Sequence, residues 1–95
     1  MRQANDLERT LPANLEAERL VLGAILLHND AYDVVVQVVS SADFFRDAHR
    51  RIFLAIQRLR ERPHGAVDLA LLSNDLGSRG DLDEVGGPAY LAALV

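Results

Sequence analysis

Apolar residues recur along the chain with the spacing of α-helices. The clearest case lies within residues 48–62, where Ile52, Ile56 and Leu59 are three or four positions apart and would line one face of a helix. Asp47 precedes this segment as a suitable N-cap, and a Pro-His-Gly run follows it as a stop signal. The pattern therefore predicts an amphipathic helix in the middle of the chain.

Capping residues and helix breakers predict four more helices. Asn14 is a good N-cap for the first, whose last two turns are apolar nearly all round, as in a central helix packed on several sides. Asp68 is suited to cap the fourth, Gly80 follows its end as a C-cap glycine, and Pro88 suits the start of the fifth. The predicted helices cover residues 15–27, 31–39, 48–62, 69–78 and 89–95.

The second of these helices conflicts with local propensity. The run DVVVQVV at 33–39 is rich in β-branched residues and by propensity alone predicts a buried strand. Asp30 and Asp33, however, resemble a helix-capping arrangement. A single strand has nothing to pair with, because no second run resembles one. We therefore predict a helix over 31–39.

Three further residues indicate packing contacts. Gly23 lies inside the first helix, where glycine costs about 1 kcal/mol relative to alanine. A close approach by another backbone would explain it, and simple tolerance is the alternative. Phe44 and Phe45 form a short aromatic connector and are expected to fill the core.

These elements define one domain of the all-α class. A chain of 95 residues with 49% apolar and 25% charged residues is typical of a single globular domain. We expect a compact multi-helix head of about five to six helices over residues 12–95. Residues 1–11 are polar and almost unpatterned, and we expect a flexible N-terminal arm there.

The chain lacks the residue patterns that metal binding and catalysis need. There is no cysteine, and the histidines at 28, 49 and 64 have no ligand-like spacing. No glycine-rich phosphate loop and no nucleophile elbow occurs. A triad of Ser41, Asp43 and His49 is a weak candidate, because a lone histidine at a helix start usually has a capping or packing role. We expect a non-enzymatic chain without metal or cofactor.

Charge and hydropathy narrow the remaining classes of function. No apolar run is long enough to cross a membrane and no secretory signal precedes the first helix, so a cytoplasmic location is expected. The net charge of −4 lacks the basic field that dominates non-specific nucleic-acid binding. Any nucleic-acid contact would have to be local.

The local exception is the segment from Arg46 to Arg62, which includes the central helix and carries six of the ten basic residues of the chain, all arginine. A solvated face is the ordinary interpretation, and a nucleic-acid-binding module that contacts phosphates is the alternative. Leu54 lies in the middle of this polar face, like an interface residue. The candidate partner interface consists of Arg50, Arg51, Leu54, Arg58 and Arg62.

Four segments together resemble a known family. They are PANLEAE at 12–18 followed by VLG at 21–23, DFFRDAHRRIF at 43–53, VDL at 67–69 with Leu72, and GDLDEVGGPAYL at 80–91. In this order and spacing they resemble the N-terminal domain of the bacterial replicative DNA helicase, the DnaB family. The one departure noted is Asp47, where the family often carries proline, and both residues suit a helix start.

The resemblance implies a helical head that lacks the helical hairpin that follows it in the family. It implies a parent protein with a linker and a RecA-like motor domain, which would hold ATP and Mg²⁺. The head would act in the hexameric ring through self-association. It would also recruit a DnaG-type primase, with a helicase loader as a further candidate partner, without direct DNA contact.

Overall fold

The computed structural model describes residues 12–95. Within this range it contains five α-helices, one short 3₁₀ helix and no strand, which confirms the all-α prediction. The elements are α2 (Pro12–Leu27), α3 (Ala31–Val35), η1 (Ser41–Asp43), α4 (Asp47–Arg60), α5 (Leu69–Ser78) and α6 (Gly87–Ala93). The predicted arm at 1–11 lies outside the described residues.

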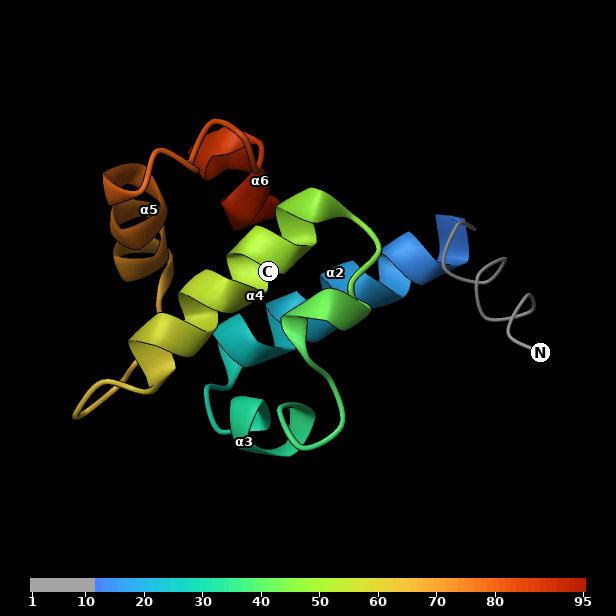
Figure 1. The fold of residues 1–95 in the computed structure, drawn as a ribbon, viewed down its shortest axis with the longest axis horizontal. Helices are drawn as coiled ribbons and strands as arrows, with labels where there is room; N and C mark the ends of the chain where they lie inside the picture. The colour runs from blue at the N-terminus through green and yellow to red at the C-terminus, as the bar shows by residue number, and fades with distance from the viewer. Residues whose placement is uncertain (1–11) are drawn as a thin grey trace.

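Helix α4 runs through the middle of the domain, and the other helices pack around it (Figure 1). Helices α5 and α6 lie together along one side of α4, while α2 runs beside it on another side. Helix α3 is attached to the end of α2, and η1 leads back into α4. The central helix predicted from periodicity is therefore α4.

The hydrophobic core forms where the apolar face of α4 meets its neighbours. Ile52, Phe53, Ile56 and Leu59 of α4 are all buried, and each contributes about 1.5–3 kcal/mol by leaving water. Their buried partners are supplied by every other α-helix and by the connections between them: Leu22, Ile25, Tyr32, Phe44, Val67, Leu72, Leu76, Val85, Leu91 and Leu94.

The start of α5 agrees with the prediction, and the start of α4 does not. Asp68 caps α5, its carboxylate accepting a hydrogen bond of 2.7 Å from the Leu71 amide. Gly80 follows α5 in the left-handed conformation at φ +76°. In α4 the N-cap is Arg46, and Asp47 is the first helical residue, so the predicted Asp47 cap is wrong. Instead, the Asp47 carboxylate accepts a hydrogen bond of 2.7 Å from Nε of Arg51, one turn later in the helix.

Helix α2 differs from its prediction in two respects. It is already helical at Pro12, so Asn14 lies inside the helix and is not its N-cap. Leu20 and Leu27 are exposed, so the apolar end of α2 is not packed on several sides as expected. The explanation of Gly23 by a close approach is confirmed, because a Cβ there would overlap the carbonyl of Leu94.

The valine-rich segment is partly helical. Helix α3 ends at Val35, and residues 36–38 form turns, so the predicted helix over 31–39 is right only in its first half. The Asp30 side chain makes no capping hydrogen bond and pairs with Arg60 at 3.2 Å. Val34 and Val38 are exposed, so no buried face holds this segment in a longer regular element.

The two neighbouring phenylalanines have different environments. Phe44 is buried against Phe53, with ring centroids 5.1 Å apart, whereas Phe45 is 44% exposed. Only Phe44 therefore fills the core as predicted. Further along the chain, the final helix α6 begins at Gly87 and ends at Ala93, two residues earlier at each end than predicted.

Candidate partner-docking site

Arg51, Leu54 and Arg58 of the predicted interface lie on one side of α4. Arg50 donates to carbonyls of the connection before α4, and Arg62 lies just beyond the end of the helix. Leu54 is 41% exposed, as its position on the polar face predicted. Arg51 and Arg58 lie about one helical turn before and after it. Both arginines reach across to the α5 side, Arg51 to Asp81 and Arg58 to Asp75. The surface around Leu54 is therefore fixed in shape by ion pairs.

The pair of Arg58 and Asp75 was not foreseen from the sequence. Two guanidinium nitrogens of Arg58, Nε and Nη2, donate to Asp75 Oδ2 at 3.1 and 2.7 Å. The Asp75 side chain is only 4% exposed, so the pair joins α4 to α5 at the edge of the core. The interpretation of Arg58 as part of a merely solvated face is therefore wrong, whereas Arg62 is 60% exposed.

Most of the other arginines of the cluster are also bonded within the domain. Arg51 pairs with Asp47 and with Asp81, and the hydrogen bond that Arg51 Nε donates to the Asp47 carboxylate is the main cause that raises the pKa of Arg51. Arg50 donates to the carbonyls of Phe44 and Phe45. Arg60 pairs with two aspartates near the start of α3. Few guanidinium groups of this segment are left for phosphate contacts, which weakens the nucleic-acid alternative.

A buried histidine holds three helices together. His49 on α4 is fully buried, with Nδ1 2.8 Å from Glu18 Oε1 on α2 and Nε2 2.7 Å from the Tyr90 hydroxyl on α6. In the neutral tautomer with its proton on Nδ1, His49 donates to the carboxylate and accepts from the hydroxyl. Glu18 also accepts from the Phe45 amide at 2.6 Å.

From the sequence we assigned His49 a capping or packing role, with a weak triad as the alternative, and did not connect it with Glu18 or Tyr90. The sequence nevertheless contained a signal for this network of three side chains. Glu18, His49 and Tyr90 fall in the segments at 12–18, 43–53 and 80–91 that carry the family resemblance. The contacts between them give those distant segments a common physical role, which is to position α2, α4 and α6.

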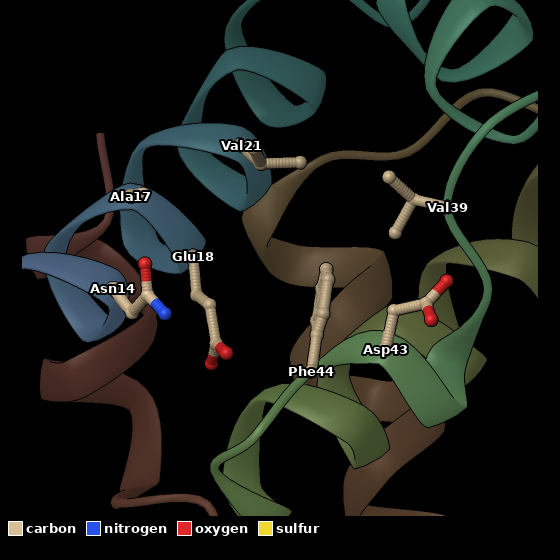
Figure 2. A pocket seen from close by; sticks show the side chains of 7 residues that line it. All are labelled: Asn14, Ala17, Glu18, Val21, Val39, Asp43 and Phe44. Atoms are coloured by element: carbon tan, nitrogen blue, oxygen red, sulfur yellow. The ribbon is translucent and has the colours of Figure 1, made fainter. Parts of the chain in front are cut away.

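A small hollow lies between α2 and η1, next to Glu18. Its volume is about 210 Å³. Figure 2 shows Val21 and Val39 pointing toward one another above Phe44, with the carboxylates of Glu18 and Asp43 on opposite sides. Among residues 12–95, no group of three histidine, cysteine or acidic side chains could hold a metal ion. No helix in the same range is long and apolar enough to cross a membrane.

The geometry defines a small helical domain whose distinctive surface is a row of fixed arginines around an exposed leucine. Residues 10–95 match the family model described as the DnaB-like helicase N terminal domain. The chain belongs to this family, as the four sequence segments had indicated.

Similar proteins agree with this assignment. The chain is 45% identical over 86 residues to a protein of Treponema pallidum named replicative DNA helicase DnaB. It is 38% identical over 87 residues to the protein of the same name from Geobacillus stearothermophilus. These matches cover 87% and 92% of the chain but only 19% of either relative, so the chain spans about a fifth of their length.

The fold also matches a solved structure. The crystal structure of the N-terminal domain of DnaB helicase from Mycobacterium tuberculosis superimposes with a TM-score of 0.81 at 38% identity. The match covers 84% of this chain and 57% of the other.

Proposed function

We propose that this chain is the non-catalytic N-terminal assembly and partner-docking domain of a hexameric replicative DNA helicase. It supports formation of the ring by self-association and recruits a DnaG-type primase during DNA replication, with a helicase loader as a possible further partner. The observation that carries the proposal is the family match over residues 10–95, in relatives that are named replicative helicases.

The surface around Leu54 supports a docking role. A half-exposed leucine surrounded by guanidinium groups combines an apolar anchor with a charged rim, which is the composition of many protein interfaces. Arg50, Arg51, Leu54, Arg58 and Arg62 are the residues proposed to contact a partner. Arg51 and Arg58 act mainly by keeping this surface rigid, because their nitrogens are already bonded to aspartates.

Under this proposal, the catalytic chemistry of the parent protein resides in its other domains. ATP and Mg²⁺ would be held by its motor domain, and the head would bind no cofactor and make no direct contact with DNA. The protein would work in the bacterial cytoplasm, associated with the nucleoid.

The proposal is tested with the full-length parent protein and a version that lacks residues 12–95. Sedimentation measures the mass of the ring, and a fluorescence titration measures the binding of the primase. We expect the truncated protein to lose primase binding and to form less stable rings. Unchanged binding and unchanged mass would overturn the proposal. A titration with plain duplex DNA serves as the test of the nucleic-acid alternative, which requires salt-dependent binding by the isolated head.

A further inference from the structure

Three arginines surround the buried carboxylate of Asp75. Arg58 binds it closely at 2.7 Å, whereas Arg62 and Arg79 lie at longer distances of 3.8 and 3.7 Å. The side chains of Arg62 and Arg79 are 60% and 49% exposed. Neither guanidinium group makes a hydrogen bond within residues 12–95. Their guanidinium donors are therefore available to an incoming group.

The charge balance at Asp75 differs from that of the other ion pairs in residues 12–95. Arg60 faces two aspartates, Asp30 and Asp33, so carboxylates outnumber the arginine there. Arg50 and Arg51 share Asp47, and Arg51 also binds Asp81, so that cluster is balanced. At Asp75 three arginines face one carboxylate, which leaves an excess of two positive charges. On a domain of net charge −4, this excess forms a local basic patch.

Two half-exposed leucines lie beside the basic patch. Leu54 precedes Arg58 by about one turn of α4 and is 41% exposed. Leu71 is 40% exposed and lines a shallow hollow together with Arg62. The surface thus offers apolar contact in the neighbourhood of two free guanidinium groups.

We propose that the surface formed by Leu54, Leu71, Arg62 and Arg79 docks an acidic segment of a partner protein. Carboxylates of that segment pair with Arg62 and Arg79, and an aliphatic side chain packs against the leucines. Arg58 is a positioning residue here, because its donors are occupied by Asp75. The inference rests on the proposed docking function and specifies the chemistry of the partner.

A protein segment fits this surface better than a nucleic acid does. Phosphate binding draws on many cations, and this patch has an excess of only two. A planar guanidinium pairs well with a carboxylate through two parallel hydrogen bonds. The flanking leucines add apolar contact that a phosphate backbone cannot use. Rim charges of this kind chiefly accelerate association and make it sensitive to salt.

The test uses the isotope-labelled 95-residue chain and a synthetic amphipathic peptide with glutamates flanking a pair of leucines. A second peptide carries glutamine in place of each glutamate. Amide shifts in an NMR titration show where each peptide binds. We expect the glutamate peptide to shift the amides around Leu54, Leu71 and Arg79, and high salt to weaken its binding. The glutamine peptide is expected to bind far less.

Charge-removing variants locate the contact. R62Q/R79Q should weaken binding of the glutamate peptide about tenfold, the effect of losing two exposed ion pairs. R62K/R79K keeps both charges but loses the paired guanidinium hydrogen bonds, so its affinity should lie between those of the wild type and R62Q/R79Q. R19Q is the matched control, because Arg19 lies on α2 and pairs with Glu16. It should leave the affinity unchanged.

Several results would overturn the inference. The first two are a glutamate peptide that does not bind and amide shifts confined to another surface. The third is equal affinity of R62Q/R79Q and the wild type for the glutamate peptide. The fourth is a single-stranded oligonucleotide that binds the same residues more tightly than the peptide does. If R62Q/R79Q does not fold, the single variants R62Q and R79Q are measured instead, and wild-type affinity of both would overturn the inference. If the peptide binds as expected but the primase does not bind the parent protein, the proposed function fails while this inference stands.

Discussion

His49 of α4 and Glu18 of α2 form a buried contact of 2.8 Å between Nδ1 and the carboxylate, in which His49 is fully buried. With the Tyr90 hydroxyl on the other ring nitrogen, both nitrogens of the imidazole have partners. A buried polar network of this kind makes the packing specific only while every member is satisfied. The orientation of α2 and α6 on α4 therefore depends on three side chains.

Glu18→Gln should destabilise the domain. The amide cannot accept from His49 and from the Phe45 amide as a carboxylate does, so we expect a loss of about 1–3 kcal/mol in the free energy of unfolding. The control is Glu16→Gln, because Glu16 is an exposed residue whose ion pair contributes less than about 1 kcal/mol. Urea unfolding measures both. Equal losses in the two variants would contradict the role given to His49 and Glu18.

Gly23→Ala tests the contact between α2 and the end of α6. A Cβ at this position would overlap the carbonyl of Leu94, and forcing the two backbones apart should cost about 1–3 kcal/mol. Gly77 of α5 is a matched control, because a Cβ there meets only a Leu82 methyl at 3.9 Å. Gly77→Ala should raise stability by up to about 1 kcal/mol, since alanine favours a helix. Thermal and urea unfolding distinguish the two. A neutral Gly23→Ala would refute the close approach.

The cap of α5 and the core of α4 should differ in their contribution to stability. Asp68→Ala removes one hydrogen bond to the Leu71 amide and should cost about 1 kcal/mol. Ile52→Ala empties a fully buried site and should cost about 2–5 kcal/mol. The order of the two losses in a urea titration is the test. The reverse order would mean that core and cap have been assigned wrongly.

Tyr32 makes stability depend on pH in the alkaline range. Burial, followed by the hydrogen bond to Glu61, raises the pKa of Tyr32 to about 12 from its ordinary 10.0. The folded state therefore keeps a proton that the unfolded chain releases, and stability falls as pH rises from about 10 to 12. In Tyr32→Phe the free energy of unfolding should fall less steeply over this range. Identical slopes in the two proteins would contradict the assignment.

The parts of the fold that local chemistry determines were predictable. The spacing of Ile52, Ile56 and Leu59 identifies α4, and Asp68 marks the start of α5 by a hydrogen bond three residues away. Both features depend only on neighbours in the chain. The segment over 31–39 shows the limit, because its β-branched side chains predict burial while Val34 and Val38 are exposed.

The features that were missed depend on contacts between distant residues. Asp75 and Arg58 are 17 positions apart, and Glu18 and His49 are 31 positions apart. No local pattern marks which arginine a given carboxylate will meet, because that depends on how the helices pack. Leu54 could be predicted to be exposed from helical phase alone, but the fixed arginines around it could not.

Leu54→Asp tests whether this domain docks partners through the exposed side of α4. Because Leu54 is 41% exposed, the free energy of unfolding should change by less than about 1 kcal/mol. Removal of an interface anchor typically costs about 2 kcal/mol, so affinity for the primase, or self-association of the full-length ring, should fall about 30-fold. Leu71→Asp on the neighbouring helix serves as a second probe of the same surface.

The decisive measurement is the titration of DnaG-type primase onto the full-length protein that carries Leu54→Asp, with the mass of the ring recorded in the same samples. We expect a folded protein that binds the primase about 30-fold more weakly or forms a less stable ring. A variant that unfolds would show Leu54 to be a core residue. A folded variant with wild-type affinity and a wild-type ring would show that the exposed side of α4 is not the docking surface.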